Sequence, residues 1–455
     1  MNNKIQMNEG KKETLYYFVL NIASKAIVYL MLLVFANFFT KEAYGRASFI
    51  ISIFYIILMF TMLGMPNTMI SWIVKRKDTS SVFYFLLLIT GITIAAGSIF
   101  SYIYNYVWIL PLIFALLFLL ITNFGLALFR VNHKHHFFQL YYTIVNLSIL
   151  ILAYFFQDGG AAGIVNAYAL TYIWLTLPIV FFNRHQIWRI VKRVRIDFEV
   201  IRLYFIKGLA TSLLVSSIGF LMWVDSSILG LISTFENVAK YSVVSSISNG
   251  ISIFSASISV FMLTRSAEVE DAMLSKNILN RSTRLAIFFS VSVALVLNSL
   301  IFILMKLFFK QYIGTEIFVM ILSTGMIFYS ITMLQCFYLT GALRQEIALA
   351  PIGIAAIINI VLDFILVPYF GLYGICIATA FAHFFAFFWL SSRMNQLREI
   401  WLLLLILWMI PLAYYMGIYG MFLIFVAIPI LFKLKLIEKE DLNVVKNTFL
   451  SIIKR

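Results

Sequence analysis

The sequence predicts an all-α polytopic membrane protein with about 14 transmembrane helices, as 12 plus a C-terminal pair, in two parallel six-helix lobes. Three observations predict this fold class. Of the 455 residues, 63% are hydrophobic and 12% are charged, whereas a soluble domain is roughly half apolar and a quarter charged. The apolar residues gather into runs of about 20, the length that spans a bilayer. Some of these runs also repeat one another along the chain.

The first predicted span, residues 15–39, follows basic residues as the core of a secretory signal does. It is too long for a signal and ends at Thr40-Lys41-Glu42 without a small-x-small cleavage site, so we expect a retained helix. Further apolar runs lie between polar segments and define the other spans. These spans are 47–72, 82–102, 107–129, 137–156, 162–183, 204–231, 241–264, 285–309, 314–341, 346–367, 371–391, 400–416 and 418–432. The last two are the shortest, and a single hairpin that dips into the membrane is the alternative for them.

The basic residues predict how the helices are oriented. The formal net charge of +15 would suit nucleic acid if the charges shared one surface, but they lie between apolar runs. When the loops are assigned to alternate sides, 28 of the 34 Lys and Arg residues fall on one side. Cytoplasmic loops collect such an excess, so we expect both termini in the cytoplasm and no nucleic-acid partner.

Motifs for catalysis or cofactor binding are absent from the sequence. No GxxxxGK[ST], HExxH or nucleophile-elbow pattern occurs, and the predicted outer loops are short. Cys336 and Cys376 both lie inside apolar runs and are interpreted as small core residues. We therefore expect no enzyme, no cofactor and no metal site.

Two internal matches indicate a duplicated six-helix unit. At an offset of 194 residues, matched polar and apolar positions pair the first two spans with the seventh and eighth. At an offset of 211, Gly160 and Gly163 align with Gly371 and Gly374, which pairs the sixth span with the twelfth. Chance similarity between apolar helices is the alternative explanation.

The repeat divides the chain into predicted domains. Residues 1–183 would form an N-terminal six-helix lobe, 184–203 a basic cytoplasmic linker, and 204–392 a second six-helix lobe. Residues 393–455 would add two extra helices and a basic cytoplasmic tail. Parallel repeats of this kind recur in secondary transporters, whose substrate site lies between the halves.

Ionisable groups inside the spans are candidates for function, because each charge at the bilayer centre costs at least ~2.5 kcal/mol. Lys25, ten residues into the first span, is a candidate contact for an anionic substrate group, with a buried ion pair as the alternative. Asp225 is a candidate coupling residue, with a salt bridge or backbone cap as the alternative. His383 is a candidate gating or titrating group. Asp363 lies nearer the predicted outer surface and precedes Pro368, so we expect it to be solvated.

Arg46 and Lys240 occupy matching positions after the first and seventh spans. Each follows a glutamate by four residues, Glu42 and Glu236, so a local ion pair is the simplest expectation for both. Their symmetry also makes them candidate gating residues at an outward-facing opening.

Three short segments resemble a known superfamily of transporters. They are Glu42-Ala43-Tyr44-Gly45, the stretch from Val224 to Gly230 around Asp225, and Pro368 to Thr379, which reads Pro-x-x-Gly-x-x-Gly-x-x-x-Ala-Thr. In span order they resemble polysaccharide-export flippases (O-antigen, Wzx-type) of the MOP (multidrug, oligosaccharidyl-lipid, polysaccharide) superfamily, with its MATE-like fold.

The resemblance implies a flippase in the bacterial cytoplasmic (inner) membrane. Its substrate would be an undecaprenyl-pyrophosphate-linked oligosaccharide for surface polysaccharide, moved between leaflets by alternating access. Lys25 fits the cationic residues of the family's central cavity, and Asp225 matches an acidic residue of its seventh span. Asn21, Asn146 and Asn359 would contact the sugar, although helix-to-helix hydrogen bonds are an equal alternative. Membrane lipid and other polysaccharide assembly proteins are the further expected partners.

Two other function classes stay open on sequence alone. A cation-coupled multidrug exporter of the same superfamily would share the fold. A membrane-bound polysaccharide polymerase or ligase would need a large outer loop with clustered charges, and the sequence has no such loop.

Overall fold

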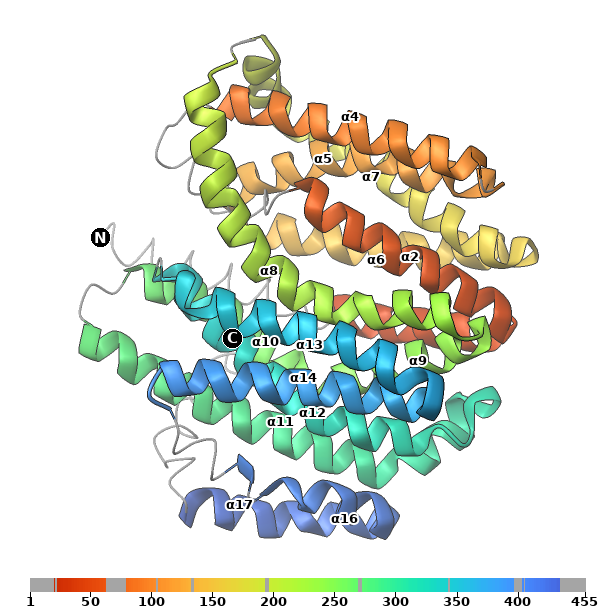
Figure 1. Cartoon of the computed structure of the whole chain (residues 1–455), viewed down its shortest axis with the longest axis vertical. Coiled ribbons are helices and arrows are strands. Elements are labelled where there is room, and N and C mark those ends of the chain that lie inside the picture. Colours follow the sequence, from red (N-terminus) through yellow and green to blue (C-terminus); the bar gives the residue numbers. More distant parts are fainter. Residues whose placement is uncertain are drawn as a thin grey trace, which may run out of the picture. The chain divides into compact units, whose positions relative to one another are not determined.

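The structure is a computed structural model in which every regular element of the described residues is helical. It describes residues 20, 23–62, 79–103, 105–131, 135–192, 196–268, 272–342, 344–396, 403–404 and 406–433. The chain divides into two compact units, Met1–Ser216 and Ser217–Arg455. Figure 1 shows their helices in sequence colours.

The first unit is built from long apolar helices. After an apolar helix at Ala23–Phe38 come α2 (Lys41–Met62), α4 (Thr79–Ile103), α5 (Leu110–Val131), α6 (His135–Phe155) and α7 (Gly160–Lys192), with short 3₁₀ turns at Val107–Ile109 and Gln157–Gly159. α5 packs against α7, and a Cβ on Gly125 would lie 2.3 Å from the Ile179 side chain. A small residue is needed there because the two helices approach closely.

α8 (Phe198–Ile232) begins in the first unit and ends in the second. The second unit continues with α9 (Phe235–Ser248), η3 (Asn249–Ser252), α10 (Ile253–Glu268), α11 (Ala272–Phe308), η4 (Lys310–Tyr312), α12 (Glu316–Gly341), α13 (Glu346–Phe370) and α14 (Leu372–Arg393). α16 (Met409–Met416), η5 (Gly417–Phe422) and α17 (Leu423–Lys433) follow and pack on α11.

α12 is the central helix of the second unit. It packs against α10, α11 and α14, and most of its side chains are buried. A Cβ on Gly325 would lie 2.7 Å from the Cα of Ala380, so the backbones of α12 and α14 are nearly in contact there. Figure 1 shows α12 and α14 running side by side.

The same arrangement of two glycines occurs at three turns between consecutive helices. Gly160, Gly371 and Gly417 have φ of 55°, 53° and 56°, a left-handed conformation that favours glycine. Three residues later, a Cβ on Gly163, Gly374 or Gly420 would lie 2.0–2.5 Å from a carbonyl oxygen of the preceding helix or its last turn. The Gly160 and Gly371 turns are the pair that the sequence repeat matched, and Gly417 adds a third copy.

The predicted fold class is confirmed. The described part of the chain contains ten helical stretches long and apolar enough to cross a membrane, the last of which, Met409–Lys433, includes the turn at Gly417. The helix ends lie close to the ends of most of the predicted spans. The chain is therefore a multi-pass membrane protein.

One predicted span differs from the structure. The span expected at 241–264 is interrupted by the 3₁₀ turn η3, which separates α9 from α10. Serines and Asn249 crowd this stretch, and their side chains compete for backbone hydrogen bonds, as when Ser252 Oγ donates to Asn249 O at 2.9 Å. The basic segment expected as a linker, 184–203, is helical at both ends, because α7 continues to Lys192 and α8 begins at Phe198.

Candidate functional site

Two carboxylic acids lie together in the second unit, within three neighbouring helices. Asp225 comes from α8, Asp363 from α13, and Thr379, which contacts Asp225, from α14. Each lies seven residues from its helix end at Ile232, Phe370 or Leu372. The cluster therefore lies about 10 Å along the helices from these ends, at 1.5 Å per residue.

Asn359 joins the two acids. It lies one helical turn before Asp363 on α13, and its Nδ2 donates to Asp225 Oδ1 and to Asp363 Oδ2, both at 3.1 Å. Since a side-chain amide has two N–H hydrogens, both are used in this way. The amide therefore fixes the spacing of the carboxyl groups.

The second oxygen of Asp225 accepts from hydroxyl groups. Tyr241 on α9 donates to Oδ2, and Thr379 Oγ1 lies 2.7 Å from the same atom. Thr379 Oγ1 also lies 2.8 Å from the carbonyl oxygen of Ile375, one turn earlier on α14. A hydroxyl has one hydrogen, so Thr379 can donate to only one of these acceptors at a time. We name Asp225, Tyr241, Asn359, Asp363 and Thr379 the acidic cluster.

The acidic cluster has no basic partner among the described residues. Asp225 is 1% exposed and Asp363 is 0% exposed, and neither carboxyl group lies within salt-bridge distance of a described Lys or Arg. Two buried carboxylates without a counter-charge are strongly destabilising. Among the described residues nothing compensates this charge, so the arrangement favours at least one bound proton or cation.

Two oxygen atoms of the cluster are buried without a hydrogen-bond donor. They are Asn359 Oδ1 and Asp363 Oδ1, one helical turn apart on α13. Carbonyl and carboxylate oxygens are the ligands that hard cations prefer. The described residues contain no group of three or more His, Cys, Asp or Glu side chains, the pattern of a transition-metal site. The cluster fits one proton or one small monovalent cation such as Na⁺.

The sequence-predicted residues of the first unit have contacts within that unit. Lys25, in the helix Ala23–Phe38, is partly buried, and no described acidic residue pairs with it. Next to it in sequence, Ser24 Oγ accepts from Asn146 Nδ2 at 3.0 Å. Asn146 thus makes the helix-to-helix bond that was the alternative to a sugar contact. Asn21 lies outside the described residues.

The two candidate gating cations behave differently. Arg46 Nη2 lies 3.2 Å from Glu42 Oε1, which confirms the predicted ion pair. The described residues Lys240 and Glu236 form no such pair, so this second expectation is wrong. Both side chains of the Arg46–Glu42 pair are well exposed, and such pairs contribute little to stability.

The interpretation of Asp363 as a solvated residue is wrong. α13 continues past Pro368 to Phe370, so Asp363 lies inside the helix and its side chain is buried. Sequence reasoning also gave no site role to Tyr241 and Thr379. The available signal was the spacing Asn359-x-x-x-Asp363, which places two polar groups on one face of an otherwise apolar helix. Asn359 itself, expected at the sugar, lies between the carboxyl groups.

His383 lies one turn after Thr379 on α14, at the next position along the same face. It is 2% exposed, and its ring centroid is 5.0 Å from that of Tyr329 on α12. His383 therefore lies on the same side of α14 as Thr379, which contacts Asp225.

Comparisons with known proteins identify the fold. No protein-family model and no curated protein sequence matches the chain. Among solved structures, the chain is similar to the lipid II flippase MurJ in an inward closed conformation, with 16% identity, a TM-score of 0.68, and coverage of 90% of this chain and 97% of that one.

It is also similar to an inward-facing multidrug resistance MATE family transporter of the MOP superfamily, with 16% identity, a TM-score of 0.59, and coverage of 85% and 96%. A MOP superfamily transporter from Pyrococcus furiosus matches with 16% identity, a TM-score of 0.55, and coverage of 86% and 97%. The chain therefore shares the fold of these transporters, which is the fold that the resemblance of the sequence segments implied.

Proposed function

We propose that this protein is a cation-coupled flippase that moves a lipid-linked oligosaccharide across the bacterial cytoplasmic membrane. The acidic cluster is the observation that carries the proposal. A buried pair of acids with no described basic partner needs a proton or cation, and the free energy of that ion can drive transport. An ion that binds from one side of the membrane and is released on the other favours one conformation while it is bound and the other after its release.

The similarity to a lipid II flippase supports a lipid-linked substrate. Such a substrate has a polar head that cannot cross hydrocarbon unaided, and a tail that stays in lipid. The head of an undecaprenyl-pyrophosphate oligosaccharide is anionic at the pyrophosphate. A transporter for it needs a cation within the membrane, and Lys25 is a partly buried Lys without a described acidic partner.

The predicted topology fits the same role. In the predicted topology, Lys and Arg gather on one side of the membrane, and in a bacterial inner membrane the charge rule predicts that this side, with both termini, is cytoplasmic. Lipid-linked repeat units are assembled on that side and polymerised on the other. Surface polysaccharide of the O-antigen, capsule or exopolysaccharide type is therefore the proposed product, and the assembly proteins that receive it are the proposed partners.

A cation-coupled multidrug exporter is the second candidate. The similarity to multidrug resistance MATE family transporters favours it. A drug exporter for organic cations would be opposed by the positive charge of Lys25, whereas an anionic head group would be attracted to it. The flippase is therefore the first proposal.

The test is a transfer assay in proteoliposomes. Purified protein is reconstituted with a labelled undecaprenyl-pyrophosphate oligosaccharide, and the glycan that becomes accessible in the opposite leaflet is measured with a proton gradient, a sodium gradient or neither. We expect protein-dependent transfer that one of the gradients accelerates. Efflux of organic cations without glycan transfer would support the exporter instead.

The acidic cluster supplies the test variants, and a buried acid outside it supplies the matched control. Asp225→Asn and Asp363→Asn keep the shape of the side chain and remove the charge, so gradient-driven transfer should stop in both. Glu316→Gln is the comparison, since Glu316 is a buried acid of the same unit whose Oε2 accepts from Gly314 N at 2.8 Å. It lies outside the cluster and should leave the gradient response unchanged.

A further inference from the structure

A row of buried polar side chains runs along the contact between α12 and α14. The two helices are parallel and in register, because Gly325 lies opposite Ala380, Tyr329 faces His383, and Gln335 Nε2 donates to Ser391 Oγ at 2.8 Å. The row begins at Thr379 in the acidic cluster. We name the row the α12–α14 seam and define it by Thr379, Tyr329, His383, Thr332, Gln335 and Ser391.

The periodicity of both helices places these residues on the facing sides. On α14, Thr379, His383 and Ser391 are separated by four and eight residues, which is one and two turns. On α12, Thr332 lies between Tyr329 and Gln335, three residues from each. On α14, Phe387 lies midway between His383 and Ser391, where the row has no polar side chain. At the height of Phe387, the polar atom comes from Thr332 of α12.

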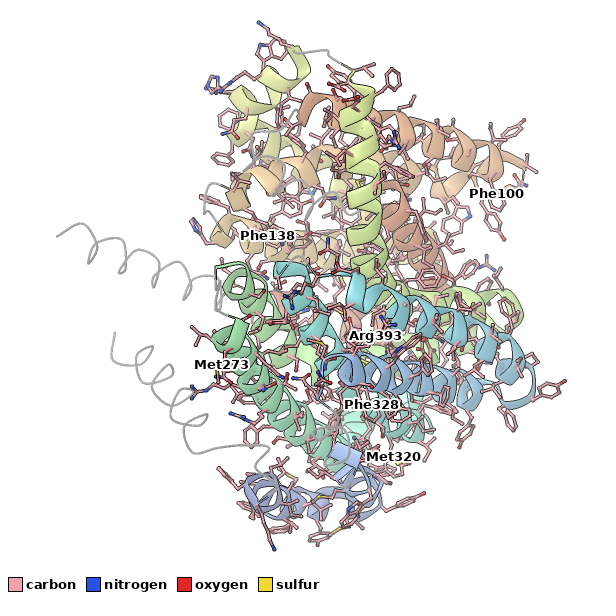
Figure 2. All side chains as sticks on the ribbon, turned by 60° about the vertical axis from the view of Figure 1, so that its left-hand side comes forward. Phe100, Phe138, Met273, Met320, Phe328 and Arg393 are labelled. Carbon is pink, nitrogen blue, oxygen red and sulfur yellow. The ribbon has the colours of Figure 1, made fainter. Side chains whose placement is uncertain are left out.

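The seam is buried along its whole length. His383 is 2% exposed, Thr332 is 4% exposed, and Gln335 and Ser391 are 0% exposed. Polar side chains in a membrane-spanning interior are costly unless they are hydrogen-bonded. Packing alone would favour apolar residues at these positions, as at Phe328, which is labelled in Figure 2 and whose ring is 5.2 Å from that of Phe387.

Two atoms of the seam are buried without a hydrogen-bond partner. They are Thr332 Oγ1 and Gln335 Oε1, which follow His383 in the direction away from the acidic cluster. Each can bond to a water molecule, and a buried water needs two to four such polar partners. The two atoms leave hydrogen-bonding capacity unused between the level of His383 and that of Gln335.

At the end away from the acidic cluster, the seam continues into a network of hydrogen-bonded side-chain amides. Gln335 Nε2 lies 2.7 Å from Gln396 Oε1, and Gln396 Nε2 donates to Asn280 Oδ1 at 3.0 Å. Asn280 lies near the start of α11, beside Arg281 in sequence, and α14 ends at Arg393, which Figure 2 labels. This basic end is the one that the charge rule predicts to be cytoplasmic.

We propose that the α12–α14 seam conducts protons between the acidic cluster and the cytoplasm, with His383 as the relay. This inference rests on the proposed function, since it identifies the coupling cation as a proton. A proton leaving Asp363 or Asp225 reaches one nitrogen of the His383 imidazole through the Thr379 hydroxyl or a water molecule. The proton on the other imidazole nitrogen leaves toward Thr332 and Gln335, and the carboxylate stays behind.

The groups around His383 suit a relay rather than a fixed charge. α12 presents the Tyr329 and Cys336 side chains, α14 itself carries Cys376, and the acids Asp225 of α8 and Asp363 of α13 lie at the level of Thr379. At the level of His383, α8 and α13 contribute Leu221 and Ala356, which pack with Ala382. No described Lys or Arg lies among these groups, so no basic side chain holds the proton away from the imidazole.

The experiment measures how fast the acids change protonation after a pH jump on the basic side. Proteoliposomes in which the basic end of the seam faces the outer solution are mixed rapidly with buffer of a new pH. Infrared difference spectroscopy then follows the C=O band of the protonated carboxyl groups. Loss of the band in Asp225→Asn or Asp363→Asn assigns it. We expect His383→Leu to slow the change about tenfold or more, with the final amplitude unchanged.

Thr332→Val gives an independent test because it removes only the hydroxyl and keeps the shape. It should slow the same step several-fold even if His383→Leu folds poorly. Ser323→Ala is the control. Ser323 is also on α12, 0% exposed and with an unpartnered Oγ, but it lies two residues before Gly325 and therefore on the opposite side of the helix.

Each outcome has a separate meaning. Unchanged rates in both His383→Leu and Thr332→Val, with a normal band, overturn the seam and leave the coupling site intact. A carboxyl band that never responds to pH, in a protein that responds to Na⁺, overturns the proton as the coupling ion. Slowing in Ser323→Ala as well would show a general packing effect and would also overturn the proposal.

Discussion

Asn359 and Asp363 lie one turn apart on α13, and the amide of Asn359 bonds to Asp363 Oδ2 while its second hydrogen bonds to Asp225 Oδ1. The remaining oxygens on α13, Asn359 Oδ1 and Asp363 Oδ1, have no donor. One amide thus holds two acids at a fixed spacing and leaves two acceptors free. This is an arrangement that an added proton or cation completes.

The first prediction concerns Asp363→Asn. Without a bound cation, the substitution removes a buried charge that has no described basic partner, so it should raise the thermal unfolding temperature in detergent. At saturating Na⁺ or at low pH the difference should shrink, because the wild-type charge is then compensated. Thermal unfolding over a series of pH values and Na⁺ concentrations measures this. A lower unfolding temperature under all conditions would contradict the assignment.

The second prediction concerns the hydroxyl of Thr379. Thr379→Val removes the group 2.7 Å from Asp225 Oδ2, and we expect ion binding at the cluster to weaken by about 1 kcal/mol. Thr379→Ser keeps the hydroxyl and should bind nearly as well as the wild type. Thr340→Val is the matched control, since Thr340 Oγ1 also donates to the carbonyl one turn earlier, Cys336 O at 2.8 Å, but touches no acid. Calorimetry at fixed pH measures the binding.

The third prediction tests the glycine turns. A Cβ on Gly374 would lie 2.5 Å from Leu366 O, so Gly374→Ala must push α13 and α14 apart and should destabilise the protein by about 1–3 kcal/mol. Gly353→Ala is the control within α13, because no atom lies within 4 Å of its added Cβ. Alanine is the better helix former there, so stability should stay constant or rise. Chemical unfolding in detergent distinguishes the two, and equal effects would contradict the turn geometry.

Much of the fold could be predicted from the sequence because hydrocarbon imposes a strict rule on it. Every backbone polar group must bond within its own helix, so each apolar run of sufficient length becomes a helix with polar residues near its ends. The runs at 314–341, 346–367 and 371–391 match α12, α13 and α14 closely. The turn glycines Gly160 and Gly371 were also visible, as one of the two internal repeats.

The acidic cluster could be predicted only in part. Asp225 was recognisable as a charge within an apolar run, but its partners are 16, 134 and 154 residues away in sequence. Such contacts depend on which helix faces pack together, and apolar runs alone do not encode that. The sequence pattern wrongly predicts a solvated Asp363 because Pro368 ends the apolar run, whereas α13 continues through Pro368 to Phe370. The break at η3 could not be predicted for the same reason, since Asn249 and Ser252 are also compatible with a continuous helix.

The fourth prediction concerns Lys25, which we expect to contact the anionic head of the substrate. Lys25→Ala should abolish transfer of a pyrophosphate-linked oligosaccharide and leave membrane insertion intact, because no described acidic residue depends on its charge. Lys25→Arg keeps the charge and should retain part of the activity, although a guanidinium places its donors differently from an ammonium. Transfer in proteoliposomes and the amount of folded protein in the membrane are measured together.

Lys310→Ala is the control for a general loss of positive charge. Lys310 is an exposed residue of η4, at the end of the helices that the charge rule predicts to face outward, and it should not matter for transfer. Neutral lipid-linked sugars provide a second comparison. If Lys25 binds the pyrophosphate, Lys25→Ala should reduce transfer of the charged substrate only. A neutral substrate has no phosphate that could pair with the Lys25 ammonium. Normal transfer of the charged substrate by Lys25→Ala would remove Lys25 from the site, and equal loss for both substrates would make its role structural.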